Sequence, residues 1–125
     1  MGGGVRTTTG RRQRTKGWRK EPGDVCVDPT SRWGNGWRII ADDSGERVGF
    51  WVCCDNNPHA QLFEDRDEAA VYAVNRYTAD IRTGANEAAR YIANHVHELR
   101  GHRLLCFCAI DAPCHRNALA VMADA

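Results

Sequence analysis

The sequence predicts an α/β fold in which a small, partly parallel sheet is flanked by helices and carries a β-hairpin insertion. Short β-prone segments alternate with helical patterns between residues 24 and 123. The segment 103–110 is apolar on both faces, as expected for a central strand of a parallel sheet. The chain has 125 residues, which is the usual length of one domain.

The first predicted strand covers residues 24–27 and ends before Pro29. The segment TSRWGNGW at 30–37 follows, with Gly34 and Gly36 on either side of an asparagine. We expect a sharp turn with positive φ there, because glycine adopts this conformation without steric cost. Trp33 and Trp37 flank the turn and are expected to be buried or half-buried.

A β-hairpin is predicted from two apolar runs at 38–41 and 48–54, since the residues between them, DDSGER, favour a loop. The segment CDNNP at 54–58 is expected to break the second strand.

Three helices are predicted after the hairpin. The first covers 64–84, with Gly84 as a C-cap and a stripe of Val71, Val74, Thr78 and Ile81. The second covers 85–102 and ends at Gly101, with a stripe of Ala88, Ile92, Val96 and Leu99. The closing helix covers 114–123.

Charge is concentrated at the start of the chain, although the formal net charge is only +1. Residues 1–20 contain no acid and seven cations: Arg6, Arg11, Arg12, Arg14, Lys16, Arg19 and Lys20. This pattern predicts a flexible basic arm over 1–20 that contacts nucleic-acid phosphates, followed by a single α/β domain over 21–125. Trp18 is expected either to stack on a base or to anchor the arm by packing.

The six cysteines are too few for a disulfide scaffold, and the sequence contains no secretory signal and no apolar run that could span a membrane. We therefore expect a protein of the reducing cytoplasm, with cysteines that are free thiols, metal ligands or core residues. The sequence contains no C-x-x-C pair, no HExxH motif and no Walker A motif.

The most informative segment joins the last strand to the closing helix and contains Cys106, Cys108, Cys114 and His115. Three interpretations remain open. All four residues could form a Cys3His metal site, Cys114 and His115 could face an anionic ligand, or the cysteines could pack in the core. We predict no bound metal, because adjacent ligands at 114 and 115 strain a tetrahedral site.

If Cys114 opens the closing helix, the positive helix end and Arg116 lower the pKa of its thiol. Asp111 and Pro113 indicate a surface loop. We therefore expect Cys114 to be exposed and to be more reactive than Cys26, Cys53, Cys106 or Cys108.

Three segments carry a resemblance to a known family: RTKGWRKEPGDVCVDPTSRWGNGW at 14–37, DEAAVYAVNRY at 67–77 and ELRGHRLLCFCAIDAPCHRNALAVMA at 98–123. Together they resemble domain of unknown function 4326 (DUF4326), found in small proteins of phages and actinobacteria. The resemblance implies a phage-type cytoplasmic protein with residues 38–64 as the insertion. The Cys-His-Arg ending is also similar to another uncharacterised α/β family, which implies a Rossmann-like sheet with a ligand at its carboxyl edge.

Two positions depart from the family pattern. Val27-Asp28 replaces a Gly-Arg pair, and Gly36-Trp37 replaces Pro-Phe. The loss of that arginine removes a candidate phosphate ligand, and Asp28 adds a negative charge. The Cys-x-Cys-x5-Cys-His pattern is intact, with Phe107 in place of tryptophan.

The leading hypothesis is a binding pocket for a nucleotide or nucleic-acid phosphate between the 33–37 turn and the Cys-His segment. The ligand-binding residues are predicted to be Arg32, Trp33, Asn35 and Arg116, and any acid–base or nucleophilic chemistry is assigned to Cys114 and His115. The alternatives are a non-enzymatic protein that binds a host protein and a small metal-binding module. No cofactor is predicted, and the pattern does not identify a reaction or an oligomeric state.

Overall fold

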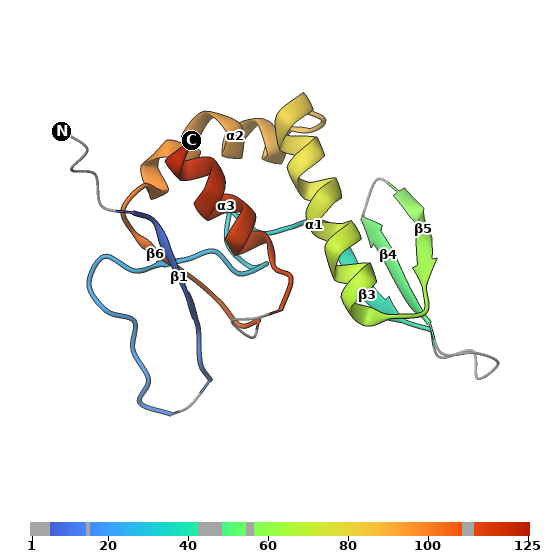
Figure 1. Ribbon diagram of the computed structural model, residues 1–125, viewed down its shortest axis with the longest axis horizontal. Coiled ribbons are helices and arrows are strands. Elements are labelled where there is room, and N and C mark those ends of the chain that lie inside the picture. Colours follow the sequence, from blue (N-terminus) through green and yellow to red (C-terminus); the bar gives the residue numbers. More distant parts are fainter. Residues whose placement is uncertain (1–5, 15, 43–48, 55–56, 109–111) are drawn as a thin grey trace.

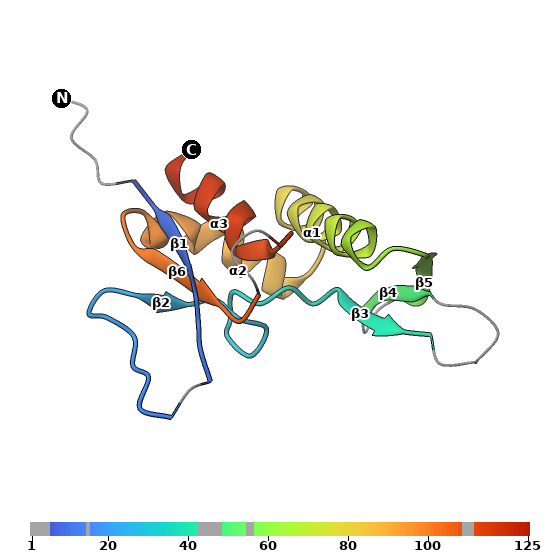
Figure 2. The same ribbon diagram turned by 60° about the horizontal axis from the view of Figure 1, so that its bottom comes forward.

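The computed structural model describes residues 6–14, 16–42, 49–54, 57–108 and 112–125 (Figure 1). The predicted α/β class is confirmed, because helices accompany one parallel and one antiparallel sheet. Helix α1 (Arg66–Thr83) lies between the two sheets in both views, and the carboxyl terminus lies on the side of the parallel sheet (Figures 1 and 2).

The parallel sheet consists of β1 (Thr8–Arg11), β2 (Val25–Cys26) and β6 (Arg103–Cys106) in the order β1-β6-β2. Gly10 and Cys26 pair with the same residue of β6, Leu105, from opposite sides. Consecutive residues of β6 are buried, and neighbours in a strand point to opposite faces. The prediction of a central strand is confirmed, although β6 ends at Cys106 and is shorter than the predicted segment 103–110.

Strand β1 was not predicted, and it begins inside the segment expected to be a flexible arm. Its start is tied to the end of the chain, because the Thr7 hydroxyl donates a 2.6 Å hydrogen bond to Asp124. The Thr7 hydroxyl also accepts a hydrogen bond from the Gly101 N–H. Residues 7–11 therefore belong to the α/β domain.

The antiparallel sheet consists of β3 (Arg38–Ala41), β4 (Phe50–Cys54) and β5 (Asn57–Phe63) in sequence order. The predicted hairpin of β3 and β4 is confirmed, and its loop at 43–48 lies outside the described residues. The expected break at 54–58 is wrong in part, because Cys54 pairs with Asn57 and β5 continues the sheet. Pro58 is compatible with this assignment because β5 is an edge strand.

The three predicted helices are present. Asp65 caps α1 by accepting a hydrogen bond from the Asp67 N–H, and Gly84 ends it at φ 66°. Helix α2 (Glu87–His95) continues into the 3-10 helix η1 (Val96–Leu99), and α3 (His115–Asp124) closes the chain.

The buried face of α1 differs from the predicted stripe. Val71 is 47% exposed, and the buried residues are Ala69, Ala73, Tyr77 and Ile81. Small alanines allow α1 to approach Trp37 and Val52 closely. In α2, likewise, Ala89 is buried and Ala88 is exposed.

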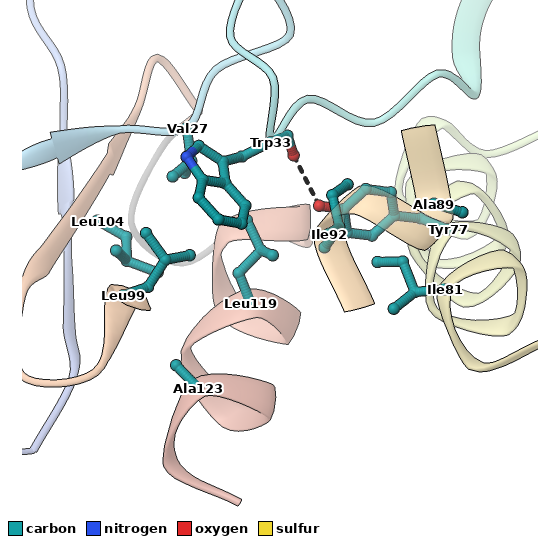
Figure 3. Packing of buried hydrophobic residues seen from close by; sticks show 10 residues of the cluster. All are labelled: Val27, Trp33, Tyr77, Ile81, Ala89, Ile92, Leu99, Leu104, Leu119 and Ala123. Atoms are coloured by element: carbon teal, nitrogen blue, oxygen red, sulfur yellow. Dashed lines mark hydrogen bonds between the residues drawn. The ribbon is translucent and has the colours of Figure 1, made fainter. Parts of the chain in front are cut away.

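The main core surrounds Trp33, which is buried as predicted. Its side chains come from both halves of the chain, from Val27 to Ala123 (Figure 3). The Tyr77 hydroxyl donates a 2.6 Å hydrogen bond to the Trp33 carbonyl. Trp37 is also buried as predicted and belongs to a second cluster beside the antiparallel sheet.

The prediction of positive φ at Gly34 and Gly36 is wrong, since neither adopts it. Gly34 is required for a different reason. A Cβ atom there would lie 2.6 Å from the Pro29 carbonyl oxygen.

Candidate nucleic-acid interface and buried cysteine cluster

The carboxyl ends of β1, β6 and β2 lie at one edge of the parallel sheet, because all three strands run in the same direction. The residues immediately beyond them are Arg12, Val27 and Phe107. This edge is where ligands bind in open α/β sheets.

A basic pocket of about 650 Å³ opens at this edge. Its lining comes from the segment after β1 and from the ends of the other two strands: Arg12, Gln13, Arg14, Trp18, Arg19, Lys20, Cys26 and Phe107. The guanidinium carbons of Arg14 and Arg12 lie 4.1 and 4.9 Å from the centre of the Phe107 ring. Phe107 therefore orders two of the cations by cation–π contact.

Asp28 does not project its charge into the pocket. It is 1% exposed and lies 2.5 Å from the Arg12 guanidinium. Burial alone raises the pKa of Asp28, but hydrogen bonds from Thr30 and Arg12 outweigh it and hold that pKa below its ordinary value. The acidic departure from the family pattern is therefore neutralised by Arg12.

The remaining predicted arm residues contribute unequally. The Arg11 Nε donates a hydrogen bond to the Phe107 carbonyl, which places it beside the same edge. Lys20 donates to the Asp24 carbonyl and still lines the pocket. Lys16 is exposed and is not among the pocket residues. Sequence reasoning did not assign Phe107 to the interface, although its place between two cysteines after β6 is a usable signal.

The cluster of Cys106, Cys108, Cys114 and His115 lies at the same edge. The Sγ atoms of Cys106 and Cys108 are 3.8 Å apart, and Cys114 Sγ is 3.7 Å from Nδ1 of His115. The donor atoms of Cys106, Cys114 and His115 all lie within 4.8 Å of one another.

Cys114 precedes α3, as predicted, but the expectation that its thiol is exposed is wrong. Its side chain is buried together with His115, and both are about 5% exposed or less. The neighbouring thiols of Cys106 and Cys108, and burial, raise the pKa of Cys114. Polar residue type at 115 and 116 misled the prediction, because both side chains find partners in the interior.

In the described part of the chain, the four predicted ligand-binding residues make separate contacts. Arg32 donates a hydrogen bond to the Tyr91 hydroxyl, and Trp33 belongs to the core. The Asn35 side chain donates to the Ala73 carbonyl. Arg116 is fully buried and donates to backbone carbonyls, including that of Gly10.

Tyr77 contacts both Trp33 of the turn and His115 of the Cys-His segment, between which the pocket was predicted. Its ring centre lies 5.4 Å from that of His115, and its hydroxyl reaches the Trp33 carbonyl. A cleft of about 450 Å³ does lie beside the turn, but it opens toward α1 and α2, between Trp37 and Ile92.

These features define a small α/β protein with a basic pocket at the carboxyl edge of a parallel sheet and a largely buried cysteine–histidine cluster at the same edge. The chain belongs to the DUF4326 family, a domain of unknown function, whose sequence model matches residues 10–125. No curated protein and no solved structure was found to match the chain. Within the described ranges, no helix has the length and apolar character needed to cross a membrane.

Proposed function

We propose that this protein binds the phosphates of a nucleotide or a single-stranded nucleic acid at the basic pocket of the parallel sheet. The observation that carries the proposal is the convergence of Arg14, Arg19 and Lys20 with Trp18 at the strand ends. Clustered cations bind phosphates, and an aromatic side chain beside them offers a stacking surface for a base.

The residues that line the pocket have different roles in the proposed binding. Arg12 is neutralised by Asp28, so it supports the pocket wall more than it attracts an anion. Arg14 and Arg19 are exposed, and Trp18 is half-buried. The exposed cations would contact phosphate, while Trp18 would stack on the adjoining base.

In this proposal the ligand binds in the basic pocket and not at the Cys-His segment, where the sequence analysis placed it. Cys114 and His115 are buried, so the proposed function is binding and assigns them no reaction. We place the protein in the reducing cytoplasm, that of the host cell for a phage-encoded protein, where its six free cysteines remain thiols.

The test is fluorescence anisotropy of labelled single-stranded DNA and RNA, with ATP as a competitor, across a salt series. We expect binding at low salt that weakens with added salt, with a slope of log affinity against log salt of about −0.7 per contacted phosphate. The double variant Arg14→Ala/Arg19→Ala should bind at least about tenfold more weakly, with a shallower slope.

The matched control is Arg66→Ala/Arg82→Ala, which removes the same charge from α1. It should retain most of the affinity. Equal losses in the two double variants would show only a general charge effect and would contradict the proposed pocket. Displacement by ATP would identify a mononucleotide site, whereas retention of the oligonucleotide would identify a polymer site.

A further inference from the structure

The cysteine cluster brings together ligand atoms from two segments of the chain. Cys106 ends β6, Cys108 follows two residues later, and Cys114 and His115 lie at the start of α3. Cys114 is extended, with φ −152° and ψ 145°, and His115 begins the helix. This change of backbone conformation allows two adjacent side chains to approach the same point. The prediction of no bound metal assumed that adjacent ligands at 114 and 115 would strain a tetrahedral site, and this geometry removes that reason.

Two of the separations match those between neighbouring ligands of a tetrahedral metal ion. Zinc binds cysteine sulfur at about 2.3 Å and histidine nitrogen at about 2.0–2.1 Å, so neighbouring ligands lie about 3.8 Å apart for two sulfurs and about 3.6 Å apart for sulfur and nitrogen. The corresponding distances are 3.8 Å between Cys106 and Cys108 and 3.7 Å between Cys114 and His115.

The histidine is oriented as a metal ligand is. His115 Nε2 donates a hydrogen bond to the Val27 carbonyl, so Nδ1 carries the lone pair and faces Cys114 Sγ. Metal-binding histidines commonly hold a backbone carbonyl with their other ring nitrogen in this way.

The local charge also suits a thiolate site. The Sγ atoms of Cys106 and Cys114 and a ring nitrogen of His115 all lie within 4.8 Å of one another. Arg116 is fully buried and donates hydrogen bonds to the carbonyls of Cys106 and Cys108. Three thiolates, one neutral histidine and Zn²⁺ carry a net charge of −1, which the Arg116 guanidinium would offset in the interior.

We propose that Cys106, Cys108, Cys114 and His115 form a closed, structural zinc site. The three thiol protons leave to solvent as Zn²⁺ binds, and no oxidation state changes. The ion would tie the end of β6 to the start of α3 and hold Phe107, which lies between two of the ligands, in place beneath Arg12 and Arg14. The site stands on its own ligands, independently of the phosphate-binding proposal.

The first test measures metal in the untagged full-length chain, expressed with added zinc and purified under reducing conditions. Elemental analysis should find about one zinc per chain. Cys106→Ser and Cys114→Ser should lose it, whereas the control Cys54→Ser, on the antiparallel sheet, should retain it. A chain without metal, or equal loss from the Cys54→Ser control, would overturn the proposal.

The second test does not depend on the variants folding. Wild-type protein is stripped with a chelator and titrated with Co²⁺, and the absorption spectrum is recorded. A thiolate-to-cobalt charge-transfer band with intense tetrahedral visible bands, saturating at about one equivalent, is the expected result. Absence of these bands, with an intact mass showing a disulfide in the purified protein, would assign the cluster to redox pairing instead.

Discussion

Gly34 lies where the turn after β2 folds back against Pro29. The glycine is needed for space rather than for backbone conformation, because the missing Cβ would clash with Pro29 backbone atoms at 2.6 to 2.8 Å. Backbone atoms cannot rotate away as a flexible side chain can. A sequence pattern of glycines in a turn cannot distinguish these two causes, which is why positive φ was predicted.

Gly34→Ala should therefore destabilise the protein by about 1–3 kcal/mol, as overpacking does. Urea unfolding followed by tryptophan fluorescence measures it. The control is Gly36→Ala, since a Cβ at Gly36 meets nothing within 4 Å and the residue has no positive φ. Similar unfolding free energies for the two variants would contradict the steric explanation.

At the scale of elements, β1 depends on the end of α3. Asp124 accepts hydrogen bonds from both the backbone N–H and the hydroxyl of Thr7, one residue before β1 begins. Strand β1 is an edge strand, so its pairing with β6 and this tie hold it in the sheet. These hydrogen bonds between Thr7 and Asp124 join the two ends of the described chain.

Asp124→Ala should cost about 1.5–3 kcal/mol of stability, the usual range for hydrogen bonds to a charged group, and should speed amide hydrogen exchange in Thr8–Arg11. Val121→Ala on the same helix is the control, because Val121 is 73% exposed. Unchanged exchange in β1 of the Asp124→Ala variant would show that the hydrogen bonds of Asp124 do not hold the strand.

The sequence pattern predicted the ends of α1 but not its buried face. Its ends were predictable from local chemistry, because Asp65 accepts a backbone hydrogen bond and Gly84 adopts positive φ. Its buried face was not, because the helix packs Ala69 and Ala73 against Trp37 and Val52 and leaves Val71 exposed. Close approach selects small residues, and a hydrophobicity pattern favours large ones.

For the whole molecule, two buried carboxylates link stability to pH. Hydrogen bonds from Arg103 lower the pKa of Asp24. The pKa of Asp28 is also lowered, because hydrogen bonds from Thr30 and Arg12 outweigh the effect of burial. Both groups bind protons more weakly folded than unfolded, so their contribution is complete above the unfolded pKa and is lost as pH falls through the folded pKa.

We therefore expect stability to fall as pH drops below about 4, the ordinary pKa of aspartate. Asp24→Asn should be less stable than wild type at neutral pH and should lose less stability on acidification. Urea midpoints at several pH values measure this, with exposed Glu64→Gln as the control. Each variant is compared with wild type at the same pH, so a loss of stability from metal release that is common to both cancels in the difference of urea midpoints. If the urea midpoint of Asp24→Asn fell with pH as steeply as that of wild type, Asp24 would not contribute to the pH dependence of stability.

Family membership, most strand and helix positions and the concentration of cations before residue 21 follow from the sequence, because local spacing, caps and motifs encode them. The tertiary structure alone decided that the chain before residue 12 adds a strand to the sheet. It also decided that Asp28 neutralises Arg12, and that His115 and Arg116 point inward. Those outcomes depend on partners more than ten residues away, such as Val27 for His115 and Gly10 for Arg116, and no local pattern records which distant carbonyl will satisfy a polar side chain.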